Sequence, residues 1–325
     1  MRQRKQPAQF WQRFDINQIE DLGNAVLGAE LEAMQMAGPP AQGSLAFAAR
    51  GGVIFSTGLI RGRVSVRGPL SRDALTLGIG LRFGPASRLW LNPVADGDVG
   101  VFLPGEACDA LFGEESLYFA ASLSEEALQK EAASEDLVLD RRSISHTGLC
   151  SRPIAHQTLA ALRDAVVRVH RDPSADDDRV GRAILRTVID HWGRFPIESP
   201  GRNDPVGLGL IVHRAREYIH ANLDAPISLD AIALAAETSR RTLARAFFQV
   251  LGDTPAGYIR RLRLHRIRRD LVRNGAAGRT IHETAAASGI REAGRMAGRY
   301  RELFGEYPHE TVNERSKRQR HGAAV

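Results

Sequence analysis

The most regular hydrophobic pattern in the chain lies in residues 227–308, where one arrangement of apolar positions occurs twice. Ser228, Leu229, Ile232, Ala233 and Ala236 recur 52 positions later as Thr280, Ile281, Thr284, Ala285 and Ser288. Leu243, Phe247, Leu251, Gly252 and Pro255 recur 53 positions later as Met296, Tyr300, Phe304, Gly305 and Pro308. Each copy predicts a capped short helix, a tight turn and a second helix that ends at Gly. Two copies are too few for a solenoid, so the repeat predicts a pair of helix–turn–helix units.

The capping signals define the helices of this part more closely. Helices are predicted over 208–222, from Ser228, from Ser239, over 255–274, from Thr280, over 292–304 and after Pro308. Ser228 and Ser239 are expected to cap their helices, because a serine hydroxyl accepts a bond from a free backbone N–H group. Thr280 and Glu283 have the spacing of a capping box. The long helix 255–274 would therefore join the two units.

Residues 43–123 show a different pattern, in which short apolar runs alternate with Gly, Pro, Asn and Asp. Turn signals recur roughly every 8–12 residues, which indicates a β-sandwich or barrel rather than βαβ units. Helical spacing is also expected over 10–37, from Ser124, over 153–170 and over 179–192. The apolar faces of the last two helices would cover the β-domain or pair with a second subunit.

These patterns predict an α+β multidomain chain with a boundary at the proline-rich segment Pro196–Pro205. The expected parts are a regulatory β-domain over 1–150, a helical dimerisation segment over 151–195, a linker over 196–207 and a helix–turn–helix domain over 208–325. The chain has 325 residues, 43% of them hydrophobic. It has neither a run of roughly 18 apolar residues nor a secretory signal, so we expect no membrane partner. Its two cysteines fit a reducing cytoplasm.

The net charge of +6 is unevenly distributed. Residues 206–325 carry 21 Lys and Arg against 12 Asp and Glu, a net charge of +9, so the remainder carries −3. Genomic bias explains why nearly all the basic residues are Arg, but it does not explain why their excess lies at one end. The asymmetry indicates a polyanion partner for the C-terminal domain alone.

The sequence ISLDAIALAAETSRRTLARAFFQVLGDTPAGYIRRLRLHRIRRDLV, followed by TIHETAAASGIREAGRMAGRYRELFGEYP, resembles the AraC/XylS family of bacterial transcription regulators. The matching points are Ser239, Leu243, Arg245, Phe247, Gly252, Pro255, Arg263, Leu264, Gly289, Tyr300, Phe304, Gly305 and Pro308. The resemblance covers about a hundred residues. It implies two recognition helices on one side of the linker helix, which enter successive major grooves of double-stranded DNA roughly 34 Å apart.

The first recognition helix has the residues that such a role requires. Ser239, Arg240, Arg241, Thr242, Ala244 and Arg245 are expected to contact DNA. Guanidinium groups suit bidentate contacts to guanine edges and phosphate. By their place in the family motif, Arg241, Ala244 and Arg245 would face bases and Arg240 a phosphate. A solvated basic face is the usual meaning of an Arg run, but the tandem repeat beside it favours DNA.

The second recognition helix departs from the family pattern. Small residues occupy one face at Ala293, Gly294, Ala297 and Gly298, where no side chain can hydrogen-bond a base. Two internal glycines also cost about 1 kcal/mol each relative to Ala. We expect this unit to read shape and phosphate through Arg291, Arg295 and Arg299, with its backbone close to DNA or a thymine methyl group against Ala293. The alternative is a unit that has drifted and no longer binds DNA.

The resemblance also implies a cupin-like, effector-binding or dimerising N-terminal domain, and residues 97–112 resemble the strand–turn–strand ending of such sheets. No His lies within 43–123, so neither a metal site nor a cofactor is expected there. No catalytic motif indicates an enzyme. Candidate residues for an effector pocket are Phe47, Phe55, Trp90, Phe102 and Tyr118.

Taken together, the sequence predicts a cytoplasmic, sequence-specific transcription regulator that responds to a small molecule. Its expected partners are double-stranded DNA, a second copy of the chain and RNA polymerase. The alternative is a dimeric DNA-binding regulator whose N-terminal domain binds no ligand and serves dimerisation or contact with a partner protein.

Overall fold

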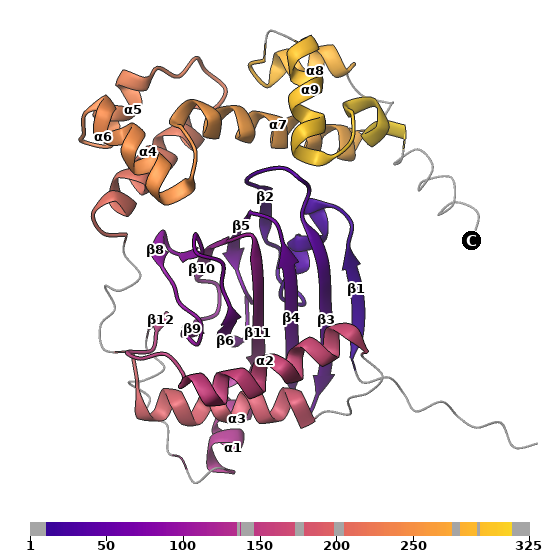
Figure 1. The fold of residues 1–325 in the computed structure, drawn as a ribbon, viewed down its shortest axis with the longest axis vertical. Helices are drawn as coiled ribbons and strands as arrows, with labels where there is room; N and C mark the ends of the chain where they lie inside the picture. The colour runs from indigo at the N-terminus through magenta and orange to yellow at the C-terminus, as the bar shows by residue number, and fades with distance from the viewer. Residues whose placement is uncertain are drawn as a thin grey trace, which may run out of the picture. The chain divides into compact units, whose positions relative to one another are not determined.

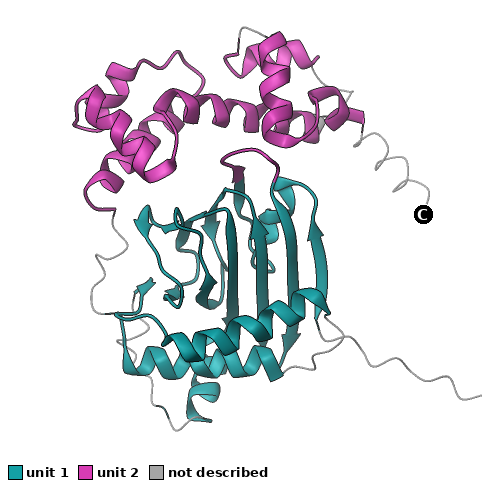
Figure 2. Cartoon of the chain, in the orientation of Figure 1, with its two compact units in different colours: residues 1–33, 41–204 teal, residues 34–40, 205–325 magenta. Residues whose placement is uncertain are grey.

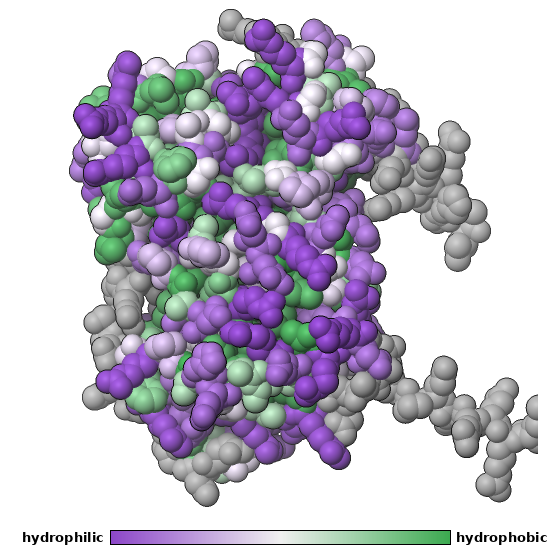
Figure 3. All heavy atoms as spheres, in the orientation of Figure 1, coloured by the Kyte–Doolittle hydropathy of each residue, from purple (hydrophilic) through white to green (hydrophobic). Residues whose placement is uncertain are grey.

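The computed structural model describes residues 11–134, 137, 146–172, 179–197, 205–274, 280–290 and 293–313. The chain forms two compact units (Figures 1 and 2). Unit 1 comprises residues 1–33 and 41–204, and unit 2 comprises residues 34–40 and 205–325. Hydrophilic residues are spread across the visible face of each unit, with smaller hydrophobic areas between them (Figure 3).

Unit 1 is built on two β-sheets. The seven-stranded sheet has the order β1 (Gln12–Ile16), β3 (Gln42–Arg50), β4 (Val53–Arg61), β11 (Glu115–Leu123), β6 (Leu75–Arg82), β9 (Val99–Phe102) and β12 (Gly148–Leu149). The five-stranded sheet has the order β2 (Glu32–Gln35), β5 (Val64–Pro69), β10 (Ala107–Phe112), β7 (Arg88–Leu89) and β8 (Asn92–Pro93). The predicted β-rich N-terminal fold is therefore confirmed. Residues 97–112 do form a strand, a turn and a strand, but β9 and β10 belong to different sheets.

Two helices, α2 (His156–Arg171) and α3 (Arg179–Arg194), cover one face of the larger sheet, and a third, α1 (Glu125–Ala133), packs against α3. Helices α2 and α3 cross the strands in Figure 1. Leu77 of β6, Val166 of α2 and Ile184 of α3 are buried in one hydrophobic cluster. The apolar faces of α2 and α3 thus cover the sheet, which is the first of the two arrangements that their sequences allow.

The prediction of a helix over residues 10–37 is wrong. Residues 12–16 form β1, which pairs antiparallel with β3, and only residues 19–24 form a short 3₁₀ helix, η1 (Ile19–Asn24). The Asp21 carboxylate accepts hydrogen bonds from the backbone N–H groups of Asn17 and Gln18 at 2.8 and 3.0 Å. Pairing with a strand distant in sequence overrides the local helical spacing here.

Unit 2 is helical. Its helices are α4 (Leu208–Ala221), α5 (Leu229–Ala235), α6 (Arg240–Leu251), α7 (Pro255–Asn274), α8 (Ile281–Ala287) and α9 (Ala293–Phe304), and residues 308–313 are also helical. The six predicted helices and the last short one are present. Within the described ranges of the chain, no helix is long and apolar enough to cross a membrane.

A short segment from the N-terminal part of the sequence also belongs to unit 2. In this segment, residues 34–40, the backbone N of Gln35 lies 2.9 Å from Nε2 of His265 on α7. His265 is fully buried, and burial is the main reason that its pKa is lowered to about 3. The imidazole is therefore neutral in the folded protein, as a buried ring surrounded by Arg side chains should be.

In unit 1, His170 of α2 makes stability depend on pH. Its Nδ1 lies 2.8 Å from Ser44 Oγ, and burial followed by the charge of Arg13 lowers its pKa to about 4. An unfolded His protonates near pH 6.5, so His170 binds a proton in the unfolded state first. We expect it to remove about 1.4 kcal/mol of unfolding free energy per pH unit as pH falls from about 6 towards 4. Denaturant unfolding of His170→Gln should show that its free energy of unfolding falls less steeply with decreasing pH than that of the wild type.

The matched control is His156→Gln, because His156 is exposed on the same helix. His156→Gln should follow the wild-type pH profile. An unchanged slope in His170→Gln would show that His170 is not the group responsible.

Candidate nucleic-acid interface

The first helix–turn–helix unit consists of α5, a tight turn and α6. Both predicted caps are present, because Ser228 Oγ accepts from Ala231 N at 3.1 Å and Ser239 Oγ from Thr242 N at 3.2 Å. The turn bends at Glu237, whose φ of 51° is left-handed. Exposed polar residues tolerate this conformation where a tight turn requires it.

The second unit repeats this backbone. Thr280 and Glu283 form the predicted capping box, in which Glu283 N donates to Thr280 Oγ1 at 3.2 Å and Thr280 N to Glu283 Oε2 at 2.8 Å. Gly289 takes the place of Glu237, with a φ of 76°. The two recognition helices, α6 and α9, are followed by Gly252 and Gly305 at φ values of 64° and 77°. The sequence repeat is therefore a repeat of conformation.

An apolar stripe holds each recognition helix in place. Leu243, Ala246, Phe247 and Val250 of α6, and Met296, Tyr300, Leu303 and Phe304 of α9, are all buried. Phe247 packs edge-on against Tyr258 of α7, with ring centroids 5.8 Å apart. Because one face of each helix is buried, the opposite face is fixed outward.

Polar networks add direction to this packing. The Tyr258 hydroxyl lies 3.1 Å from both Arg216 Nε and His220 Nε2 of α4. Near α9, Arg268 Nη1 of α7 donates to Glu306 Oε1 at 2.6 Å, and its guanidinium lies 4.8 Å from the Phe304 ring. Buried charge pairs of this kind fix orientation because their partners are satisfied in one geometry only.

Helix α7 sets the distance between the two helix–turn–helix units. Figure 1 shows α4, α5 and α6 at one end of α7, and α8 and α9 at the other. Its 20 residues give a length of roughly 30 Å at 1.5 Å per residue. This is close to one turn of B-DNA, roughly 34 Å.

The outward face of α6 is basic. Ser239, Arg240, Arg241, Ala244 and Arg245 are exposed, and Thr242 is half-buried. Arg240 forms a two-pronged ion pair with Asp230 of α5, which raises the pKa of the guanidinium and lowers that of the carboxyl group. The structure thus places all six predicted residues around the start of one helix.

Several arginines of α7 have partners within unit 2. Arg261 pairs with Asp253 at 2.8 Å, Arg266 with Asp224, and Arg268 with Glu306. These side chains are held within the domain. The arginines of α7 are therefore weaker evidence for DNA binding than those of α6.

Arg263 has a role that the sequence did not reveal. Its Nη1 donates to the carbonyl of Gly289, in the turn of the second unit, at 3.2 Å. Its Nη2 donates to the carbonyl of Ala225, in the loop before α5, at 3.1 Å. One side chain of the linker helix therefore connects the two helix–turn–helix units. Its match to the family motif was the only signal in the sequence.

Two exposed glycines, which have no side chain, lie on the outward face of α9. Gly294 and Gly298 are exposed, and a Cβ atom added to either would meet no atom within 4 Å. Arg295 and Arg299 are exposed beside them, whereas Met296 is buried in the stripe. Ala293 begins the helix; its side chain, all of Arg291 and the basic tail from residue 314 lie outside the described residues. Packing therefore does not require the two glycines.

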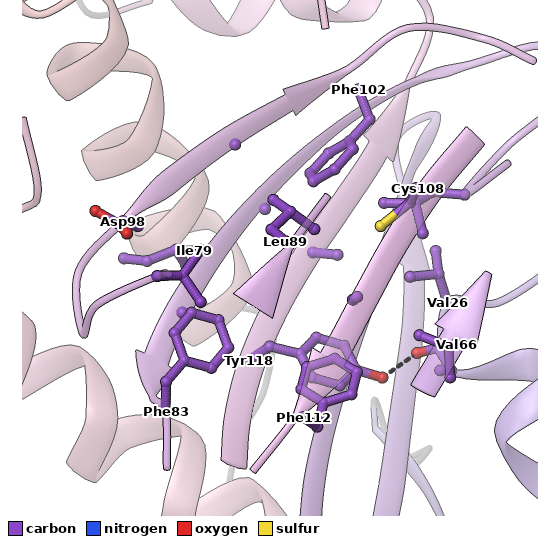
Figure 4. A pocket seen from close by; sticks show the side chains of 18 of the residues that line it. Val26, Val66, Ile79, Phe83, Leu89, Asp98, Phe102, Cys108, Phe112 and Tyr118 are labelled. Atoms are coloured by element: carbon purple, nitrogen blue, oxygen red, sulfur yellow. Dashed lines mark hydrogen bonds between the residues drawn. The ribbon is translucent and has the colours of Figure 1, made fainter. Parts of the chain in front are cut away.

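The candidate effector-pocket residues separate into two groups. Phe102 and Tyr118 line an apolar cavity in unit 1 (Figure 4), but Phe47, Phe55 and Trp90 do not. Phe55 points to the opposite face of the sheet and packs with α3 in the main core. Phe47 packs against Phe14 with the rings tilted, and the ring centroids of Trp90 and Phe102 are 5.6 Å apart. Within the described part of the chain, no group of His, Cys, Asp and Glu is arranged to hold a metal ion.

Comparisons with known proteins support the assignment of unit 2. Residues 232–314 match the family described as "Helix-turn-helix domain". The chain is 38% identical over 104 residues to the XylDLEGF operon transcriptional activator of Pseudomonas putida, and 33% identical over 102 residues to a probable thc operon regulatory protein of Rhodococcus erythropolis. These matches cover 32% and 31% of this chain. The chain spans about a third of the length of these curated relatives, 32% and 31%.

Solved structures give similar matches. A probable AraC family transcriptional regulator from Rhodopseudomonas palustris is 31% identical, with a TM-score of 0.31, and the match covers 32% of this chain and 96% of the other. The AraC-like transcriptional activator CuxR is 16% identical, with a TM-score of 0.36, over 86% of this chain and 100% of the other.

Two helix–turn–helix units on one linker helix define unit 2 as a double helix–turn–helix domain, in agreement with the family match over residues 232–314. The match over residues 232–314 and the similarity to the Pseudomonas activator identify unit 2 as a helix–turn–helix domain of the AraC/XylS type.

The tie made by Arg263 can be tested by substitution. Arg263→Met should lower the free energy of unfolding by about 1 to 2 kcal/mol, because two backbone carbonyls lose a charged donor. Denaturant unfolding of the full chain measures this change. Arg260→Met, at an exposed position of the same helix, should change stability by less than about 0.5 kcal/mol. Equal effects of the two substitutions would contradict the structural role of Arg263.

The two glycines of α9 give a second prediction on stability. Gly294→Ala combined with Gly298→Ala should raise the free energy of unfolding by about 1 to 2 kcal/mol, because Ala favours the helix and the added methyl groups meet open space. Gly257→Ala is the control, since its Cβ would clash with the Asp253 carboxylate. A loss of stability in the α9 double variant would show that these glycines serve the fold.

Proposed function

We propose that the chain regulates transcription by binding a specific DNA sequence through unit 2. The outward face of α6 is the observation that carries this proposal, because it places Arg241 and Arg245 side by side, exposed, on a helix whose other face is buried. Helices presented in this way fit the major groove. The cytoplasm, where bacterial DNA lies, is the expected compartment.

Each exposed residue of α6 suits one kind of contact. Arg241 and Arg245 would donate two hydrogen bonds to guanine O6 and N7, and the methyl group of Ala244 would contact thymine. Arg240, held by Asp230, would lie beside the backbone, and Ser239 and Thr242 would approach phosphate at the positive end of the helix. Base recognition therefore rests on the middle of the face.

The second unit contributes differently in this proposal. Arg295 and Arg299 would contact phosphate, and the small face at Gly294 and Gly298 would let the α9 backbone approach the groove. Such contacts read groove shape rather than bases. If this is correct, the Gly294→Ala and Gly298→Ala double variant gains stability and loses DNA affinity together.

Unit 1 is proposed to regulate this activity. The cavity beside Tyr118 favours a small-molecule effector over a domain that binds no ligand. We also propose that the chain acts as a homodimer. Since the apolar faces of α2 and α3 are occupied by the sheet, a dimer would use their polar outer faces, which carry Arg168 and Arg186.

Comparing the two recognition helices tests the proposal. Arg241→Ala should reduce discrimination between the preferred site and random DNA by roughly 10- to 100-fold, the value of about 1 to 3 kcal/mol for a lost bidentate base contact. Arg295→Ala should weaken binding to both DNAs alike and lower the slope of affinity against salt by about one ion. Fluorescence anisotropy at several salt concentrations measures both.

Arg171→Ala, an exposed position in unit 1, controls for the loss of one positive charge. An equal loss of discrimination from Arg241→Ala and Arg295→Ala would refute the unequal roles of the helices. Full discrimination in Arg241→Ala would refute base reading by α6.

A further inference from the structure

The cavity of unit 1 lies between its two β-sheets. Residues Gly78 and Ala120 belong to β6 and β11 of the larger sheet, and Val66 and Cys108 belong to β5 and β10 of the smaller one. All four line a space of about 90 Å³. Figure 4 shows the rings of Phe83, Phe102, Phe112 and Tyr118 around it.

Strand alternation explains why space is left here. Along β6, Leu75, Leu77, Ile79 and Leu81 belong to the core under the helices, so Gly78 and Gly80 occupy the other face. Gly78 pairs in register with Gly100 of β9 on one side and with Ala120 of β11 on the other. Three neighbouring strands therefore place small residues in one row at the floor of the cavity. The ring of Phe102 packs against Gly78 and Gly100, since a Cβ atom at these positions would meet it at 3.2 and 2.8 Å.

The cavity has a cover that is fixed by hydrogen bonds. The hydroxyl of Tyr118 donates to the carbonyl of Ala25, and the N–H of Leu27 donates to Ser56 Oγ at 3.0 Å. Ala25, Val26 and Leu31 contribute apolar side chains to the wall. Phe112 stacks on Tyr118, with ring centroids 5.6 Å apart.

The polar groups of the cavity wall contact other groups of the protein. The Tyr118 hydroxyl is used by Ala25, and burial raises its pKa, so it stays protonated. Burial, with the nearby charge of Asp109, raises the pKa of the Cys108 thiol as well. Asp98 Oδ2 accepts from Ala95 N at 2.7 Å, and Arg88 Nη1 lies 3.5 Å from the carbonyl of Leu91. What remains facing the space is almost entirely carbon.

We propose that this cavity binds a small, uncharged and apolar molecule about the size of one hydrocarbon ring. An ion or an unpaired hydroxyl would lose its hydration there, and the charged groups of the wall, Arg88 and Asp98, already contact other parts of the chain. Apolar cavities of this kind do bind such molecules, as an engineered cavity of roughly 150 Å³ in another protein binds benzene. Because this space of about 90 Å³ is smaller than that cavity, a bound ring would require small rotations of the wall side chains. That binding regulates DNA affinity rests on the proposed function; that binding occurs does not.

The experiment compares toluene with phenol on the full-length chain. The two have equal numbers of heavy atoms and differ by a methyl and a hydroxyl group. Toluene should raise the unfolding temperature in a concentration-dependent way, and phenol should bind at least tenfold more weakly, with benzoate giving no shift. Tighter binding of phenol or benzoate, or no shift with any of the three, overturns the proposal.

Two filling variants locate the site. Ala120→Leu, from the larger sheet, and Ala110→Leu, from the smaller one, should each abolish the shift with toluene, so a folding failure in one leaves the other. Val166→Ala, in the core on the opposite face, should lower stability but keep the shift. Persistence of the shift in a folded filling variant would overturn the assignment.

Affinity for the preferred DNA site is then measured with and without toluene. A change of roughly 5- to 150-fold, the usual range for coupled sites, would support an effector role. Binding of toluene without any change in DNA affinity would support the cavity assignment and contradict regulation through it. Failure of sequence-specific DNA binding itself would refute the proposed function and leave the toluene result standing.

Discussion

Burial of one apolar stripe on each recognition helix is the constraint on which the structure of unit 2 depends. Phe247 and Tyr300 are fully buried, so the rotation of α6 and α9 about their axes is fixed by packing. The packing of the buried stripe therefore also determines which residues of each helix face the solvent. Arg241 and Arg245 on one helix, and Gly294 and Gly298 on the other, point outward for the same physical reason.

The sequence predicted most of unit 2 because its signals are local. The caps at Ser228, Ser239 and Thr280 involve residues only three positions apart, and the apolar stripes follow helical spacing. The tie made by Arg263 was missed, because it depends on two carbonyls 26 and 38 positions away. No spacing rule identifies a donor to a distant backbone group.

In unit 1 the strands were predictable, but the direction of their side chains was less so. The helix expected over 10–37 failed because β1 pairs with β3, a contact between distant segments. Aromatic content suggested Phe55 as a pocket residue, yet alternation along β4 turns it into the core under the helices. The cavity is instead marked by Gly78, Gly100 and Ala120, whose alignment depends on register across three strands. Register is a tertiary property.

The central claim is that unit 2 binds a specific DNA sequence with two unequal helix–turn–helix units. Selection of bound fragments from a random DNA pool by the full-length chain, at physiological salt, tests it most directly. The account predicts one enriched motif, with strong base preference in the segment read by α6 and weak preference about one helical turn, roughly 10 base pairs, away. Enrichment of no sequence would contradict the account.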